Sequence, residues 1–162
     1  MGADIKLRVG SPNEFGENER DAFVNFVVKA GKIDAAPIKS LVSDAVALGM
    51  VYSNYDLIGS AALKRPNIAY RTSVFKKAGV ESPEIYPFEL GWVHVDEAFR
   101  SGGLAKKLAS AVLEHTDGQG IYATTSSNAM SNILQGLGYN KAGNKYKSRD
   151  GKENLSLFIR TK

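Results

Sequence analysis

A run of aromatic and β-branched residues ends at two glycines, and an amphipathic pattern begins directly after them. Residues 87–96 are typical of a strand. Beyond Gly102 and Gly103, apolar residues recur at helical spacing, starting from Leu104. Such a turn leaves the first N–H groups of the helix unpaired, with the positive end of the helix dipole behind them. The sequence therefore predicts a strand, a glycine turn and a helix that can bind phosphate.

Strand-like and helix-like segments alternate along the whole chain. Apolar alternation predicts strands over residues 5–9, 45–52, 56–63, 87–96, 120–125, 140–147 and 154–160, and helical spacing predicts helices over 19–30, 34–43, 67–78, from 104 onwards and over 128–136. This order indicates an α+β (mixed α/β) fold, with helices packed on a sheet of six or seven strands.

The length of the chain favours one domain over residues 1–162, since 162 residues can bury one proper core. No cysteine is present, which excludes disulfides, thiolate metal sites and cysteine nucleophiles and favours a cytoplasmic location. With only two histidines as well, no metal is expected. The first residues lack an apolar signal core, and no apolar run is long enough to span a bilayer, so no membrane partner is expected.

The formal net charge of +4 is unevenly distributed. No acid occurs between Asp56 and Glu81, and this stretch contains five basic residues: Lys64, Arg65, Arg71, Lys76 and Lys77. Such a group suits an anionic partner, which is either nucleic acid or the phosphates of a nucleotide cofactor. A solvated basic surface remains the alternative.

The glycine turn contains the pattern Arg100-x-x-Gly103-x-Ala105, which resembles the Q/R-x-x-G-x-G/A motif of the GNAT acyltransferase superfamily. Residues 128–139 resemble the late helix of that family and its Leu-Gly-aromatic turn. The resemblance implies a mostly antiparallel sheet, acetyl-CoA (coenzyme A) as cofactor and an N-acetyltransferase activity. The cofactor-binding residues that it implies are Val93, His94, Val95, Arg100, Ser101, Gly102, Gly103, Leu104, Ala105 and Asn128.

The resemblance also implies direct attack of a neutral amine on the thioester, with the acyl carbonyl polarised by N–H groups freed where strand 87–96 splays from its neighbour. Glu89 lies eleven positions before Arg100, where several members of the family have a catalytic base. We expect Glu89 to be the general base, with a rim carboxylate paired with a lysine as the alternative. His94 is a second candidate base, but regular alternation places it on the face opposite Glu89 unless the strand has a bulge.

The acid that protonates the departing thiolate is missing from its usual position. Members of the family commonly have a tyrosine there, and this chain has Leu134. Tyr139, Tyr146 or a water held by Ser126 and Ser127 could replace it, and we include Tyr139 among the catalytic candidates.

The acceptor is expected to be a small-molecule or protein amine, and the protein a monomer or homodimer. Helix 67–78 looks like an insertion relative to the family, and such connections often shape substrate choice. Two alternatives remain open: a nucleic-acid-modifying enzyme resembling the phage Mom proteins, and a member that binds acyl-CoA without turnover. Trp92 is expected to belong to the core.

Overall fold

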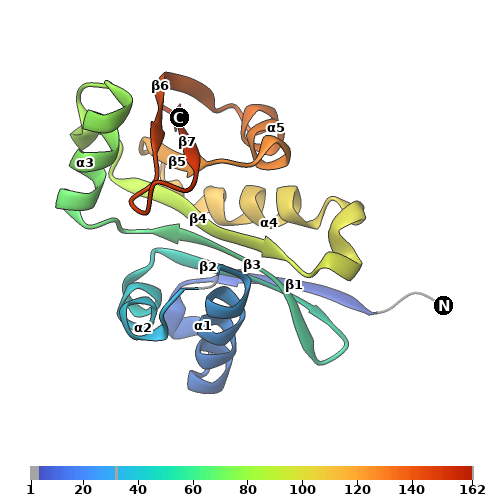
Figure 1. Cartoon of the computed structure of the whole chain (residues 1–162). Helices are drawn as coiled ribbons and strands as arrows, with labels where there is room; N and C mark the ends of the chain where they lie inside the picture. Colours follow the sequence, from blue (N-terminus) through green and yellow to red (C-terminus); the bar gives the residue numbers. More distant parts are fainter. Residues whose placement is uncertain (1–3, 32, 162) are drawn as a thin grey trace. The chain divides into compact units, whose positions relative to one another are not determined.

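The computed structural model describes residues 4–31 and 33–161, with the side chain of Ser101 outside the described part. The N-terminal half contains β1 (Ile5–Gly10), α1 (Glu17–Gly31), α2 (Ala35–Asp44), β2 (Ala47–Ser53), β3 (Asp56–Lys64) and α3 (Ile68–Ala78) (Figure 1). The C-terminal half contains β4 (Phe88–Val95), α4 (Leu104–Leu113), β5 (Ile121–Thr125), α5 (Asn128–Gly136), β6 (Asn140–Lys147) and β7 (Asn154–Arg160). Every predicted strand and helix is confirmed, with ends that differ by no more than two residues.

The strands form a seven-stranded sheet in the order β1-β2-β3-β4-β5-β7-β6 within the described residues. Strands β4 and β5 pair in parallel, whereas the pairs β1–β2, β2–β3, β5–β7 and β6–β7 are antiparallel. The predicted α+β fold with a mostly antiparallel sheet is therefore confirmed. Within the described residues, no helix is long and apolar enough to cross a membrane.

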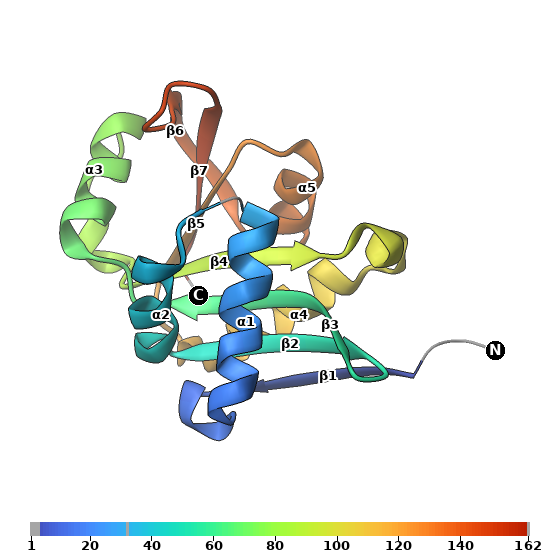
Figure 2. The same cartoon turned by 60° about the horizontal axis from the view of Figure 1, so that its bottom comes forward.

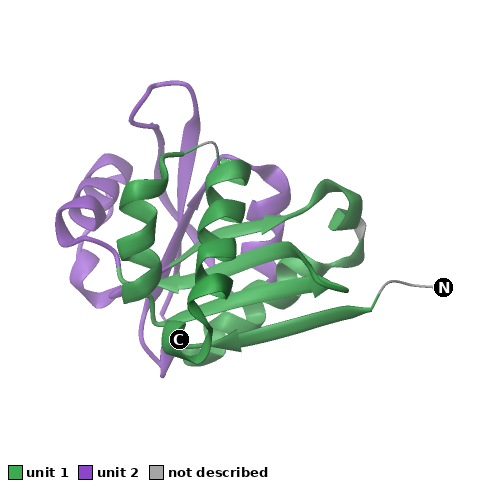
Figure 3. Ribbon diagram, turned by 90° about the horizontal axis from the view of Figure 1, so that it is seen from below, with its two compact units in different colours: residues 1–65, 90–115 green, residues 66–89, 116–162 purple. Residues whose placement is uncertain are grey.

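The chain divides into two compact units, which Figure 3 distinguishes by colour. Unit 1 comprises residues 1–65 and 90–115, and unit 2 comprises residues 66–89 and 116–162. The boundary falls within β4, so that Glu89 belongs to unit 2 and Leu90 to unit 1. That residues 1–162 form a single domain stays a prediction.

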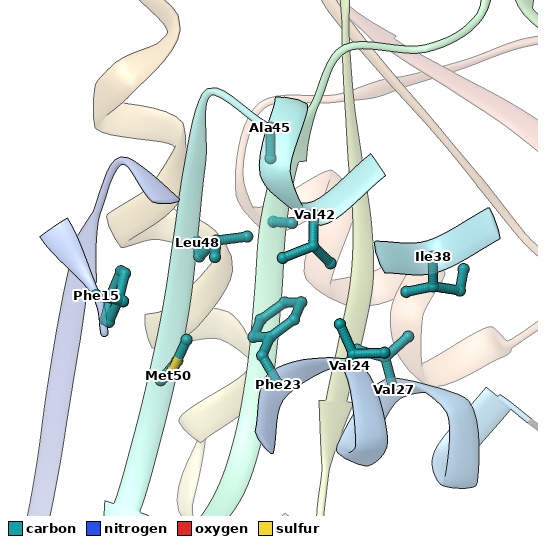
Figure 4. Close-up of a cluster of buried hydrophobic side chains, with 10 residues drawn as sticks. Phe15, Phe23, Val24, Val27, Ile38, Val42, Ala45, Leu48 and Met50 are labelled. Atoms are coloured by element: carbon teal, nitrogen blue, oxygen red, sulfur yellow. The ribbon is translucent and has the colours of Figure 1, made fainter. Parts of the chain in front are cut away.

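In unit 1, helices α1 and α2 pack on one face of strands β2 and β3 (Figure 2). Figure 4 shows this core, in which the α1 residues Phe23, Val24 and Val27 meet Leu48 and Met50 of β2. Because strand side chains alternate between faces, residues 48 and 50 define the face that these helices cover. As expected, Trp92 packs against this core, with its ring centroid 6.1 Å from that of Phe23.

Helix α4 covers the opposite face of the same strands. A methyl group at Gly49 would lie 3.0 Å from Val112 of α4, and one at Gly59 would lie 3.0 Å from Leu108. Two strand glycines therefore allow α4 to approach the sheet closely. These contacts hold the middle and the carboxyl end of α4, whose amino end follows the glycine turn.

Unit 2 has a second core, in which α3 packs against the β6–β7 hairpin and β5. Its largest members are Phe75, Tyr86 and Tyr122. The rings of Phe75 and Tyr86 are stacked, with their centroids 5.4 Å apart. Helix α3 has strong end signals: Asn67 accepts hydrogen bonds from the first turn, and Gly79 adopts the left-handed conformation at φ 74°. The buried residues Val74, Phe75 and Ala78 pack this helix against the second core.

Candidate active site

The glycine turn joins the end of β4 to the start of α4 through a short 3₁₀ segment, Glu97–Gly102. Gly103 follows at φ 74°, a conformation that glycine adopts without steric cost, and it is the N-cap of α4. The side chain of Arg100 folds back on the strand, where its Nε donates a hydrogen bond to the Val95 carbonyl at 3.0 Å. The predicted strand, turn and helix are therefore present.

The amino end of α4 is suited to an anion. No side chain caps it, and its first turn contains no acid. Methyl groups placed at Gly102 and Gly103 would meet nothing within 4 Å, so the backbone of the turn is open to a ligand. The amino end of α1 differs, because Glu19 already accepts a hydrogen bond from the Gly16 N–H at 3.0 Å. Phosphates fit the N–H groups and the helix dipole at the α4 turn.

The pairing of β4 with β5 is short. It consists of Phe88 opposite Ile121 and Glu89 opposite Tyr122, so residues 90–95 of β4 are not part of this ladder. Trp92 takes a left-handed φ of 52°, an uncommon conformation for a bulky residue within a strand. The expected departure of the strand from its neighbour around Val93 stays a prediction.

His94 is half-buried, and a methyl group at Gly31 of α1 would lie 3.9 Å from its Nε2. Burial, and then the nearby Arg100 guanidinium, lower the pKa of His94, which favours the neutral imidazole. The left-handed Trp92 lies between Glu89 and His94. Regular alternation therefore cannot be used to place these two side chains on opposite faces.

Glu89 is buried, with only 4% of its surface exposed, so it does not lie on an exposed rim as the alternative assumed. The Tyr70 hydroxyl from α3 donates a hydrogen bond to Glu89 Oε2 at 3.4 Å. Sequence reasoning left the role of α3 open, and the structure brings α3 to the candidate base.

Four tyrosine hydroxyls interact electrostatically with the Glu89 carboxylate. Burial is the main reason why the pKa values of Tyr70, Tyr122 and Tyr139 lie well above the ordinary value, and it raises the pKa of Tyr146 to about 12. The negative charge of Glu89 contributes to all four increases. The buried surroundings of Glu89 are therefore rich in tyrosine and poorly hydrated.

The candidate acids differ in their surroundings. Leu134 is completely buried, and the Tyr139 hydroxyl is buried without a hydrogen-bond partner among the described residues. Tyr146 has the lower pKa of the two tyrosines and lines a pocket. Ser127 caps α5 by accepting a hydrogen bond from the Met130 N–H at 3.1 Å. Asn128, a predicted cofactor contact, is the exposed first residue of α5. The proton donor stays a prediction.

The five basic residues of the acid-free stretch fall in both units, with Lys64 and Arg65 in unit 1 and the other three in unit 2. The Lys64 ammonium lies 4.5 Å from the ring centroid of Trp92, within unit 1. In unit 2, Arg71 donates to the Tyr86 carbonyl at 3.4 Å, while Lys77 lines a pocket. Of these five residues, Lys77 is the one that lines this pocket. Within the described residues, no cluster of three or more His, Asp or Glu could hold a metal ion.

A pocket of about 420 Å³ between α3 and the β6–β7 hairpin was missed by sequence reasoning. The α3 residues Tyr70, Ser73, Val74 and Lys77 line it. Their spacing of i, i+3, i+4 and i+7 is that of one helix face, which is the signal that could have found it.

No family model matches the sequence, and no curated protein is significantly similar to it. Solved structures do match over nearly the full length. An acyl-CoA N-acyltransferase from Pseudomonas aeruginosa has a TM-score of 0.70 at 12% identity, covering 97% of this chain and 99% of its own.

Two further structures illustrate the same likeness. Drosophila melanogaster polyamine N-acetyltransferase, which forms N-acetylagmatine, has a TM-score of 0.70 at 14% identity and covers 98% of this chain and 100% of its own. Salmonella typhimurium yncA, solved with its cofactor acetyl-CoA, has a TM-score of 0.65 at 14% identity and covers 98% of this chain and 94% of its own. The chain has the acyl-CoA N-acyltransferase fold. Solved acetyltransferases of the GNAT family share this fold, which is the fold that the resemblance of the glycine turn implied.

Proposed function

We propose that this protein is an N-acetyltransferase that transfers the acetyl group of acetyl-CoA to an amine, with Glu89 as general base. The observation that supports this most is a single strand, β4, which contains a buried carboxylate near its start and leads into the glycine turn after its end. The fold supports this proposal, because solved proteins that share it include acetyltransferases.

The residues proposed to hold acetyl-CoA belong to the glycine turn and to the end of β4. N–H groups of Gly103, Leu104 and Ala105 would bind the pyrophosphate, and Arg100 would hold the turn against Val95. The backbone of Val93–Val95 would polarise the acyl carbonyl. Acetyl-CoA supplies the activated acetyl thioester.

Glu89 would take the proton that an ammonium must lose before its nitrogen can attack. Glu89 is buried and accepts a hydrogen bond from the Tyr70 hydroxyl, so its carboxylate is held in a fixed position where it can take that proton. The acceptor is not transferred from the Drosophila enzyme, since 14% identity supports the fold and nothing finer. Tyr139 remains a proposed proton donor for the thiolate, and Asn128 a proposed cofactor contact.

Acetyl-CoA is expected to raise the melting temperature of the protein. A ligand at 100 times its Kd stabilises the native state by about 2.7 kcal/mol, or roughly 5–10 °C for a domain of this size. Thermal unfolding with acetyl-CoA, CoA and adenosine monophosphate measures this, the last as a control that lacks the pyrophosphate. No shift at millimolar acetyl-CoA would contradict the proposal.

Gly102→Val is expected to weaken acetyl-CoA binding by about tenfold to a hundredfold, because the side chain occupies the open approach to the turn and costs charge-assisted hydrogen bonds. Gly102 lacks a left-handed φ, so the substitution adds no strain of that kind. Gly16→Val is the matched control, since Gly16 directly precedes α1 and also has room for a side chain. Calorimetric titration gives both affinities. Equal affinity in the two variants would show that the α4 turn does not bind the cofactor.

A further inference from the structure

The pocket of unit 2 has the size and the walls of a small-molecule site. Its volume of about 420 Å³ lies within the usual range for such sites. Tyr70 and Val74 of α3 form one wall, and Tyr146 and Leu155 of the β6–β7 hairpin form the other. Apolar and aromatic walls of this kind suit an aliphatic chain.

The charged residues that line the pocket all have the same sign. They are Lys77 from α3 and Lys147 and Arg149 from the hairpin, and no acid lines the pocket among the described residues. The nearest acid in sequence, Asp150, has its carboxylate tied into the hairpin turn, where it accepts hydrogen bonds from the Ser148 hydroxyl at 2.7 Å and the Lys152 N–H at 3.0 Å. The pocket therefore favours an anionic group and disfavours a second cation.

One wall of the pocket contacts the candidate base directly. Tyr70 lines the pocket, and its hydroxyl donates to Glu89 Oε2 at 3.4 Å. While it donates to Glu89, the same oxygen can accept a hydrogen bond from an ammonium in the pocket. Proton transfer from that ammonium to Tyr70 Oη, with the phenolic proton passing to Glu89, leaves a neutral amine and a neutral phenol.

The two ends of the α3 wall are well separated. Tyr70 and Lys77 are seven residues apart, which is about 10 Å along a helix axis. An acceptor that contacts both residues must have several bonds between its amine and its anionic group. A chain of about six carbon atoms meets this requirement, whereas the α-amine and α-carboxylate of one amino acid are too close together.

We propose that this pocket binds the acceptor substrate, a primary amine with a carboxylate or phosphate at the far end of an aliphatic chain. The anionic group lies among Lys77, Lys147 and Arg149, and the amine lies at Tyr70. This inference rests on the proposed acetyltransferase function and adds the chemical class of the acceptor.

Four six-carbon amines test the proposal: hexylamine, 1,6-diaminohexane, 6-aminohexanoate and 6-aminohexyl phosphate. At low ionic strength we expect kcat/KM for at least one of the two anionic amines to exceed that for hexylamine at least tenfold, with 1,6-diaminohexane poorest. The preference should fall with added salt, because screening weakens the attraction. The larger of the two anionic values distinguishes phosphate from carboxylate recognition. Equal values for all four amines, or a preference for the diamine, would overturn the proposal.

A double charge reversal, Lys147→Glu with Arg149→Glu, locates the effect. It should raise KM for the anionic amines at least tenfold while leaving kcat and acetyl-CoA affinity nearly unchanged. Lys29→Glu with Lys39→Glu is the matched control, because it makes the same charge change on exposed residues of α1 and α2 in unit 1. If both double variants behave like the wild type, the pocket does not bind the acceptor.

Direct binding separates this inference from the proposed activity. NMR titration of 6-aminohexyl phosphate and 6-aminohexanoate into the protein without acetyl-CoA should shift amide signals of α3 and the β6–β7 hairpin in the wild type and not in the pocket variant. If no amine is acetylated but these shifts occur, the proposed function fails and the anion-binding pocket stands. Acetylation without any shift at the pocket overturns the pocket and leaves the function.

Discussion

Glu89→Gln is expected to lower turnover by roughly 10² to 10⁴ near neutral pH, the usual contribution of a general base. Glutamine keeps the shape of the side chain and can still accept a hydrogen bond from Tyr70, but it cannot take a proton. Acetyl-CoA affinity should stay nearly constant, because the residues proposed to bind the cofactor are those of the glycine turn. Steady-state kinetics with a fixed amine acceptor and calorimetric titration of acetyl-CoA measure the two quantities.

The pH dependence distinguishes loss of a base from general damage to the site. An aliphatic amine with a pKa near 10 becomes neutral without help as the pH rises, so the activity of Glu89→Gln should partly recover toward pH 10. Glu84→Gln is the matched control, since it makes the same chemical change on an exposed carboxylate of unit 2. Wild-type turnover with an unchanged pH profile in Glu89→Gln would exclude Glu89 from the mechanism. His94→Ala would then be tested next.

Local sequence patterns predicted the elements because their causes are local. Asn67 and Gly79 cap the two ends of α3, and Gly103 takes a left-handed conformation at the start of α4. The alternation of strands and helices indicated an α+β fold, and the resemblance of the glycine turn to the GNAT motif implied the particular fold. These features depend on residues that are neighbours in the chain.

The surroundings of Glu89 could not be predicted in the same way. Its tyrosine neighbours come from α3, β5, β6 and the turn after α5, and nothing in the segment 87–90 indicates that they gather there. The conformation of Trp92 is also set by its tertiary context, since bulky residues rarely adopt a positive φ. Long-range packing therefore decided both the burial of the candidate base and the interruption of alternation beside it.

The sequence of α3 contains two sets of residues with different surroundings, one in the core and one at the pocket. Phe75 and Ala78 are buried in the core, while Tyr70, Ser73 and Lys77 line the pocket together with Val74. When a helix contacts both a core and a pocket, its apolar residues spread over two faces. The apolar pattern then does not show which residues belong to which face. The partner of the pocket face, the β6–β7 hairpin, lies about 70 residues further along the chain.

Gly143→Ala is expected to destabilise unit 2 by about 3 kcal/mol, because Gly143 is where α3 docks on β6. A methyl group there would lie 2.1 Å from the Ala78 carbonyl oxygen, and a backbone atom cannot swing aside as a flexible side chain does. Gly143 also has φ 69°, where a side chain adds about 1–2 kcal/mol of strain to roughly 1–3 kcal/mol of overpacking. The melting temperature should fall on the order of 10 °C.

Gly151→Ala isolates the cost of the backbone conformation. Gly151 has φ 74° on the β6–β7 turn, and a methyl group there would meet nothing within 4 Å. This variant should lose only about 1 kcal/mol, the cost of the left-handed conformation alone. Hydrogen exchange should show that Gly143→Ala exposes the amides of α3 and that Gly151→Ala does not, since only the first change displaces the helix.

Because α3 contains Tyr70 and Lys77, Gly143→Ala should also raise KM for the acceptor more than it changes acetyl-CoA affinity. Equal stability of the two variants would mean that α3 is not held by its contact with Gly143.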